Sequence, residues 1–256
     1  MTDQVLGYYC SRMQNLLADF DETAVLVKDS VVGRYGETFA DTLHSAIRRE
    51  YEMLIPEIPY IKGPRGRALN TFLLITAQEL AAWKAMKGEG KSAAETWELC
   101  HQAIRAKAGR IPRWKRWLSR RLMFSRLVRR IFARREKLGQ THRLGDFEIQ
   151  YLLGDGDEFD LGVNYLQCGN HRFALEHGGE EFAPYICMSD IALSDAMGWG
   201  LIRTRTLADG CDHCDFRFKS EAPTRISSQT PAVQQAIERI RDEEAGSAAA
   251  GEVEAP

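Results

Sequence analysis

The sequence predicts an α+β fold, in which N-terminal helices pack against a C-terminal antiparallel sheet of about four strands. Before Gly139, apolar residues recur every three or four positions, which is typical of helices with one buried face. After Gly139, apolar and polar residues alternate, which is typical of strands. Because the two patterns occupy separate parts of the chain, we expect the helical part over residues 1–140 and the sheet part over residues 141–220.

The helical part contains three well-defined helical patterns. Residues 37–54 carry apolar side chains at nearly every fourth position, and residues 69–87 form a second helical stretch. Ser92 and Glu95 form a capping box, so a third helix begins at residue 93 and runs towards residue 107. We expect the apolar faces of these helices to supply much of the core.

The sheet part contains two hairpin patterns. Residues 147–153 and 159–167 alternate around a Gly-Asp-Gly-Asp turn sequence. Residues 201–219 alternate again on both sides of an Ala-Asp-Gly turn, and a short helical pattern through Asp190 precedes them. These segments give the four predicted strands.

The chain is long enough for one large domain, and 44% apolar residues suffice for a core. We therefore assign residues 1–220 to a single α+β domain and residues 221–244 to a C-terminal segment, whose helix starts at Thr230-Pro231. The tail of residues 245–256 is rich in alanine, glycine and glutamate, and we expect it to be disordered.

Hydropathy and cysteine usage indicate a cytoplasmic protein. No apolar run reaches the roughly 20 residues that cross a bilayer, and residues 1–4 lack the basic start of a secretory signal. Six cysteines in a chain of 256 residues are sparse for a disulfide scaffold. We expect them to be free thiols, ligands or nucleophiles.

Positive charge is concentrated in one segment. Between Arg110 and Lys137 there are twelve basic residues and one acidic residue, whereas the whole chain has a net charge of −2. A broad apolar stripe runs between the arginines of residues 111–138, and such a surface fits another protein, an anionic membrane surface or a nucleic-acid backbone. We expect packing on protein and a homodimer, with the membrane as the second option. Nucleic acid is the least favoured partner because no nucleic-acid-binding module is recognisable.

Three blocks of sequence carry a family resemblance. The longest block runs from Cys187-x-x-Asp190 through Arg203-Thr204-Arg205-Thr206-Leu207-Ala208 and Gly210 to Cys214-Asp215-Phe216-Arg217-Phe218. Two shorter blocks lie upstream, at Glu57–Ile61 and at Phe159–Asn164 with Cys168. In this order the blocks resemble the L-2-amino-thiazoline-4-carboxylic acid hydrolase family. The resemblance implies a hydrolase that opens a small cyclic amidine or isothiourea carrying a carboxylate, by attack on its amidine-like carbon.

Two cysteine–aspartate pairs are the catalytic candidates. Cys187 lies at the start of the helix that leads through Asp190, where the partial positive charge of a helix N-terminus favours a thiolate. Asp190 either caps this helix or moves a proton, and Cys214 and Asp215 supply a second thiol and carboxylate. We expect Cys187 to attack the amidine-like carbon, the two aspartates to manage protons and Cys214 to line the same pocket.

Arginines on the second hairpin are candidates for binding the substrate carboxylate. Arg203 and Arg205 share one face of the predicted strand, and a guanidinium binds a carboxylate with two parallel hydrogen bonds. The resemblance adds Thr206, Asn164 and Cys168 as substrate-binding candidates. We expect no cofactor.

The same region also suggests two alternatives to a hydrolase, a zinc site and a ligand-binding module. Cys168 and His171, and Cys211 and Cys214, are each separated by two residues, which is the ligand spacing of a closed tetrahedral zinc site. A small-molecule-binding or sensory module is the non-enzyme alternative, because the hairpin and its cysteines also loosely resemble vinyl-reductase-type ligand-binding domains. Metal content and thiol reactivity distinguish these functions.

Overall fold

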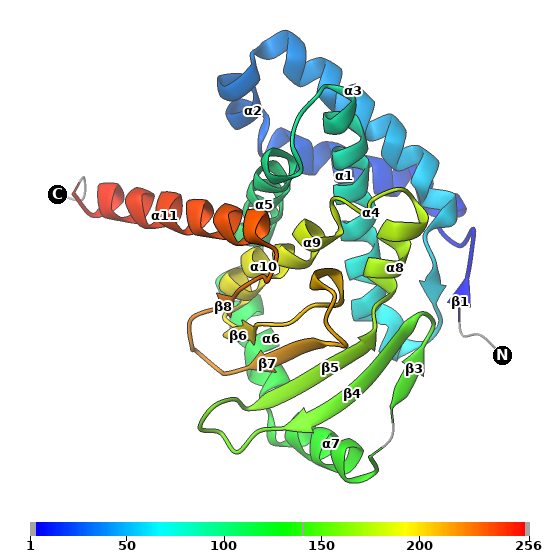
Figure 1. Cartoon of the computed structure of the whole chain (residues 1–256), viewed down its shortest axis with the longest axis vertical. Coiled ribbons are helices and arrows are strands. Elements are labelled where there is room, and N and C mark those ends of the chain that lie inside the picture. The colour runs from blue at the N-terminus through cyan, green and yellow to red at the C-terminus, as the bar shows by residue number, and fades with distance from the viewer. Residues whose placement is uncertain (1–3, 140, 254–256) are drawn as a thin grey trace.

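The computed structural model describes residues 4–139 and 141–253, with side chains up to residue 246. Most helices come from the N-terminal half and the main sheet comes from the C-terminal half, which confirms the predicted α+β class (Figure 1). The helices are α1 (Met13–Val25), α2 (Lys28–Tyr35), α3 (Glu37–Leu54), α4 (Arg67–Gly88), α5 (Ala93–Gly109), α6 (Arg113–Met123), α7 (Arg126–Lys137), α8 (Gly169–Glu176), α9 (Ala183–Ile186), α10 (Asp190–Met197) and α11 (Pro231–Val253). The strands are β1 (Gln4–Val5), β2 (Tyr60–Ile61), β3 (His142–Leu144), β4 (Phe147–Leu153), β5 (Leu161–Gln167), β6 (Leu201–Arg203), β7 (Cys214–Phe218) and β8 (Arg225–Ile226).

The helices expected from the hydrophobic pattern are present. α3 has the predicted bounds and buries its apolar stripe, including Leu43, Ile47 and Tyr51. The predicted cap of α5 is also present, because the hydroxyl of Ser92 accepts a hydrogen bond from the backbone N–H of Glu95 at 3.2 Å. α4 is buried along most of its length, because it contacts α3, α5 and α8 as well as β2.

The main sheet is larger than the four antiparallel strands that we predict. It has six strands in the order β3-β4-β5-β7-β6-β8, and β8 pairs with β6 in parallel. The four predicted strands form its centre, and β3 and β8 extend it at the two edges. These edge strands have three and two residues, too few for an alternating pattern to reveal. β1 and β2 form a separate two-stranded sheet.

The predicted second hairpin is present, but its first strand is short. β6 pairs with β7 so that Leu201 lies opposite Phe218, and β6 then ends at Arg203 instead of continuing to Leu207. The carboxylate of Asp215 binds the backbone after β6, and a 3₁₀ turn follows over residues 207–209. Only the first of the two predicted hairpin arginines, Arg203, is therefore part of the sheet.

The C-terminal segment also differs from the expectation. α11 begins at Pro231, as the sequence indicates, and continues to Val253, although we expect a helix to residue 244 and a disordered tail over residues 245–256. Alanine has the highest helix propensity, and the alanines after residue 246 continue the helix. Residues 254–256 lie outside the described residues.

One set of buried apolar side chains joins the helical and sheet parts. It extends from Leu17 in α1 through Trp83 in α4 to Ile149 in β4 and Val233 in α11. Helices α8, α9 and α10 lie between the sheet and the N-terminal helices (Figure 1). None of the described helices has both the length and the apolar character needed to cross a membrane.

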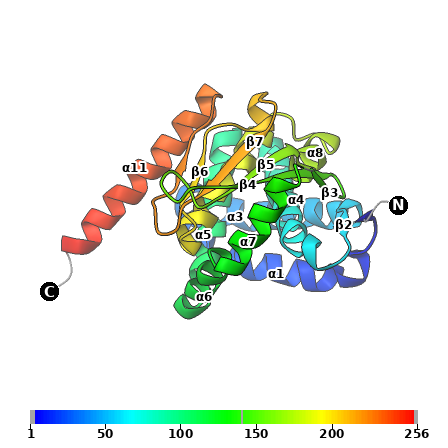
Figure 2. The same cartoon turned by 90° about the horizontal axis from the view of Figure 1, so that it is seen from below.

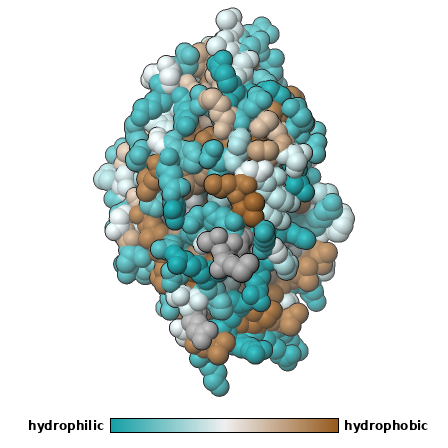
Figure 3. Space-filling model, turned by 90° about the vertical axis from the view of Figure 1, so that its right-hand side faces the viewer, coloured by the Kyte–Doolittle hydropathy of each residue, from teal (hydrophilic) through white to brown (hydrophobic). Residues whose placement is uncertain are grey.

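The basic segment forms two helices, α6 and α7, which Ser125 separates by capping the second one. α6 contacts α10 and α7 lies against β4 (Figure 2). Their outer faces carry large apolar side chains that are at least 40% exposed. We call this set the α6–α7 surface: Trp114, Trp117, Leu118, Leu122, Leu127, Ile131 and Leu138. On the side of the molecule shown in Figure 3, apolar patches also interrupt the hydrophilic surface at the lower end.

Candidate active site

A small cavity of about 110 Å³ lies where the sheet meets α4 and α10, and we call it the sheet cavity. Five of the predicted site residues line it: Cys168, Cys187, Asp190, Arg203 and Cys214. They come from the end of β5, from the turn between α9 and α10, from the start of α10 and from β6 and β7. The fold thus brings three thiols, one carboxylate and one guanidinium to a single site.

Arg203 holds the two sides of this cavity together. Its side chain is 1% exposed, and Nη1 donates to Oδ2 of Asp190 at 2.5 Å. Nη2 donates to the backbone carbonyl of Cys187 at 2.5 Å. The guanidinium also lies over the ring of Phe216, with its carbon 5.0 Å from the ring centroid. Arg203 therefore connects the sheet to the turn between α9 and α10.

Burial acts on the pKa values of both members of the ion pair. It lowers the pKa of Arg203, but the negative charge of Asp190 outweighs this effect and leaves the pKa above its ordinary value. Burial raises the pKa of Asp190, and the charge of Arg203 offsets only part of the rise. Among the described residues, the hydrogen bond to the Asp190 side chain goes to Oδ2, which leaves Oδ1 to accept a proton or an N–H group.

Burial raises the pKa of all three thiols of the sheet cavity, which favours their protonated forms. Burial raises the pKa of Cys187 well above its ordinary value, and the nearby Cys214 raises it further. Burial also raises the pKa of Cys168 and raises that of Cys214 to about 12. Cys187 lies in a 3₁₀ turn before α10, where the loss of hydration outweighs the nearby positive charge of Arg203. The structure does not support the thiolate that we predict from the helix start.

The side chains of two predicted site residues, Arg205 and Asp215, form contacts within the second hairpin. Asp215 accepts hydrogen bonds from the backbone N–H groups of Thr204 and Arg205, at 2.9 and 2.7 Å. The side chain of Arg205 pairs with Asp212 at 2.8 Å and is 46% exposed. Because β6 ends before it, Arg205 does not line the cavity with Arg203.

Two further predicted residues also lie outside the cavity wall. Thr206 is buried and caps the 3₁₀ turn by accepting a hydrogen bond from the backbone N–H of Asp209 at 3.0 Å. Asn164 donates to the side-chain oxygen of Gln150 at 3.0 Å. Side chains alternate along β5, and Tyr165 is the β5 residue that lines the cavity, so Asn164 points to the other face of the sheet.

The zinc alternative needs four ligands that the fold does not gather. Cys168, His171 and Cys214 line the sheet cavity, whereas Cys211 lies outside it. Within residues 4–139 and 141–253, no three histidine, cysteine, aspartate or glutamate side chains are grouped as metal ligands. The sulfur of Cys214 instead accepts a hydrogen bond from the backbone N–H of Leu207 at 3.3 Å.

A family model described as L-2-amino-thiazoline-4-carboxylic acid hydrolase matches residues 74–218, which is more than half of the chain. The chain belongs to this hydrolase family. The family name implies a hydrolase that acts on the amino-thiazoline carboxylate ring, and therefore a small substrate that carries a carboxylate. The match includes the predicted site residues that line the sheet cavity, but not the Glu57–Ile61 block. No curated protein and no solved structure matches the chain.

Glu79 also lines the sheet cavity of this hydrolase-family chain, and it is not among the predicted site residues. It lies on α4, is 3% exposed and accepts a hydrogen bond from the hydroxyl of Ser189. Burial raises the pKa of Glu79 to about 8, and the charge of Asp190 adds to the rise. A signal was present in the sequence, because Glu79 is an acid directly before Leu80 on the apolar face of its helix.

Replacing Glu79 with glutamine should change how stability depends on pH. The folded protein holds the proton of Glu79 up to about pH 8, whereas the unfolded chain releases it near the ordinary value of 4.5. The contribution of Glu79 to the free energy of unfolding is therefore largest below pH 4.5. It falls between pH 4.5 and 8, by up to about 1.4 kcal/mol per pH unit. Urea unfolding should show that the free energy of unfolding decreases less from pH 5.5 to pH 7.5 in Glu79→Gln than in the wild type. The exposed Glu181→Gln substitution is the control, and an equal loss in all three proteins would contradict a buried, protonated Glu79.

Polar atoms in the wall of the sheet cavity lack partners among the described residues. They are Nε of Arg203, Nε1 of Trp199 and Oδ1 of Asn170, and all three are buried. A buried polar group without a partner costs about 1–3 kcal/mol. A bound polar molecule would offset this cost, so the cavity is suited to a small ligand with both hydrogen-bond donors and acceptors.

Proposed function

We propose that this chain hydrolyses a small cyclic amidine or isothiourea with a carboxylate, of the amino-thiazoline carboxylate type, in the sheet cavity. The observation that carries the proposal is the convergence of the Arg203–Asp190 ion pair with three thiols inside the segment that matches the family. The cavity volume of about 110 Å³ is suited to a compact ring rather than to a larger molecule.

Ring opening needs a nucleophile, a proton acceptor and a proton donor. In the proposed mechanism, the sulfur of Cys187 attacks the amidine-like carbon and Oδ1 of Asp190 accepts the thiol proton. Glu79, which is neutral below about pH 8, donates a proton to the leaving ring atom. Water then attacks the same carbon, and the bond from this carbon to the Cys187 sulfur breaks. Asp190 returns its proton to that sulfur, and Glu79 recovers a proton from the attacking water. The raised pKa of Asp190 makes it a stronger proton acceptor than an exposed carboxylate.

We assign the substrate carboxylate to the donors for which the described part of the chain offers no partner. Nε of Arg203 and Nε1 of Trp199 are buried N–H groups in the cavity wall. Nη1 and Nη2 of Arg203 already donate to Asp190 and Cys187, whereas Nε has no partner among the described residues. A carboxylate bound there would be paired with a positive charge in a site of low polarity, where such hydrogen bonds are strong.

The test is turnover of 2-amino-thiazoline-4-carboxylate by the purified chain. We expect a product heavier than the substrate by one water molecule, detected by mass spectrometry. The same ring without the carboxylate should react more slowly, because it cannot use Arg203. Saturable binding of the carboxylate ring without any turnover would instead support the small-molecule-binding or sensory module.

We also propose that the α6–α7 surface binds an anionic membrane surface. Seven exposed basic residues accompany its exposed tryptophans and leucines: Arg113, Lys115, Arg121, Arg126, Arg130, Arg134 and Lys137. Among the described residues, the ion pairs formed from this segment involve Arg120 and Arg129 instead. A two-fold homodimer through this surface would place equal positive patches against each other, whereas anionic lipids would neutralise them.

Vesicle sedimentation tests the membrane proposal. The chain should sediment with phosphatidylserine-containing vesicles at low salt but not with pure phosphatidylcholine vesicles. The double substitution of Trp114 and Trp117 by alanine should weaken this binding. The predicted homodimer is the competing outcome: a dimer in light scattering that Trp117→Glu dissociates, with no vesicle binding, would reverse the assignment.

A further inference from the structure

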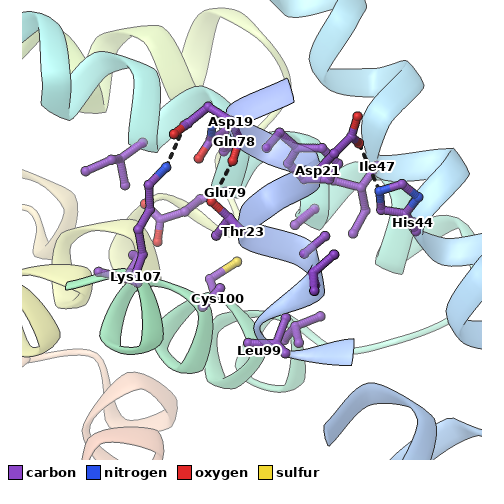
Figure 4. A pocket seen from close by; sticks show the side chains of 18 of the residues that line it. Asp19, Asp21, Thr23, His44, Ile47, Gln78, Glu79, Leu99, Cys100 and Lys107 are labelled. Carbon is purple, nitrogen blue, oxygen red and sulfur yellow. Dashed lines mark hydrogen bonds and ion pairs between the residues drawn. The ribbon is translucent and has the colours of Figure 1, made fainter. Parts of the chain in front are cut away.

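A second and larger cavity lies in the helical part of the chain. It has a volume of about 580 Å³ and is lined by residues from α1, α3, α4 and α5, so we call it the helical cavity (Figure 4). Helices α1 and α3 precede residue 74, so much of its wall lies outside the segment that matches the family model. Cavities of this size are within the range that holds drug-sized molecules.

Most of the wall of the helical cavity is apolar. Phe20, Leu43, Ile47, Leu74 and Leu99 are examples from four helices. Water in contact with an apolar wall finds few hydrogen-bond partners there. Contact with an apolar molecule would remove the same surface from water, which is favourable.

The charged groups that line this cavity are paired with each other. Asp19 accepts a hydrogen bond from Nζ of Lys107 at 2.5 Å, and Asp21 lies 3.0 Å from Nε2 of His44 (Figure 4). Lys28 and Asp41 form a further pair at 3.4 Å. Asp19, Asp21 and Asp41 therefore each have a basic partner, and a charged ligand would have to break one of these pairs. The remaining acid of the wall, Glu79, accepts a hydrogen bond from Ser189, and burial raises its pKa to about 8.

The helical cavity and the sheet cavity are neighbours. Ile75 and Glu79 on α4 and Leu193 on α10 line both of them. Their chemical characters differ, because the sheet cavity contains the Arg203–Asp190 ion pair and buried polar atoms that find no partner within residues 4–139 and 141–246. A small polar ring suits the sheet cavity, and an apolar molecule suits the helical cavity.

We infer that the helical cavity is a second binding site, which takes a neutral, predominantly apolar small molecule. The size of the cavity, its apolar wall and the pairing of its charged side chains all support this ligand class. The inference does not depend on ring hydrolysis in the sheet cavity.

Fluorescence titration with the neutral probe N-phenyl-1-naphthylamine tests the inference. We expect saturable binding of one probe molecule per chain, with increased fluorescence because the probe leaves water. Ala103→Trp places a large side chain in the cavity wall on α5 and should weaken binding at least about tenfold, the factor that 1.4 kcal/mol represents. Gln102→Trp adds the same side chain at an exposed neighbouring position and should bind the probe like the wild type.

Two further variants keep the result interpretable. Ala24→Phe fills the cavity from α1 and should weaken probe binding even if Ala103→Trp does not fold. Asp190→Asn alters the sheet cavity alone and should bind the probe normally, whether or not it hydrolyses any ring. The inference is overturned if the wild type does not bind the probe, if folded variants with a filled cavity bind it unchanged, or if Asp190→Asn abolishes binding.

Discussion

Replacing Arg203 with methionine should lower the free energy of unfolding by about 3–5 kcal/mol, the usual cost of removing one partner of a buried ion pair. The substitution leaves Asp190 without its partner and removes the donor to the carbonyl of Cys187. Methionine keeps much of the side-chain volume, so the loss reports on charge and hydrogen bonding rather than on a void. Urea unfolding measures the change.

Arg205→Met is the matched control for this substitution. Arg205 lies two residues further along and is also paired with an aspartate, but the Arg205–Asp212 pair is exposed. Exposed pairs contribute only about 0–1 kcal/mol, so the control should remain close to the wild type. The double variant Arg203→Met with Asp190→Leu should recover much of the lost stability, because no buried charge is left unpaired. If Arg203→Met and Arg205→Met lower the free energy of unfolding equally, the buried ion pair does not stabilise the fold more than the exposed one.

Cys187→Ala should lower the rate of ring opening by several orders of magnitude without unfolding the chain, because this sulfur is the nucleophile of the proposed mechanism. Asp190→Asn should lower the rate about 10²–10⁴-fold, the usual contribution of a positioned acid or base. Mass spectrometry of the product measures both rates, and circular dichroism checks the fold.

Substitutions outside the sheet cavity serve as controls for the activity assay. Cys211 and Asp215 lie on the same hairpin but do not line the cavity. Cys211→Ala and Asp215→Asn should therefore keep most of the activity, although Asp215→Asn weakens the turn after β6. Full activity in Cys187→Ala would show that Cys187 is not the nucleophile, and that water activated by Asp190, or Cys214, attacks instead. A large loss in Asp215→Asn with an intact fold would restore Asp215 as a proton carrier.

The sequence by itself determined the type and order of most elements. The four-residue apolar repeat of residues 37–54 predicts α3 because only a helix places those residues on one face. The alternation in residues 147–153 predicts β4 for the corresponding reason. Family resemblance on Cys187, Asp190, Arg203 and Cys214 indicated which residues to expect together, and all four line one cavity.

Only the tertiary structure decided how those residues are used. Arg203 and Arg205 look equivalent in sequence, yet one is buried against Asp190 and the other pairs with Asp212 at the surface, because β6 ends between them. Burial also raises the pKa of Cys187 well above its ordinary value, which favours the thiol over the thiolate because packing removes the water that would stabilise the charge.

Sites made from distant segments were also beyond the reach of sequence patterns. Glu79 meets Ser189, 110 residues away in the chain, and no local spacing relates the two. The helical cavity depends on how α1, α3, α4 and α5 fit together, since each helix alone shows only an ordinary apolar stripe. Periodicity records which face of an element is buried, whereas cavities, ion pairs and pKa values arise from the packing of several elements against each other.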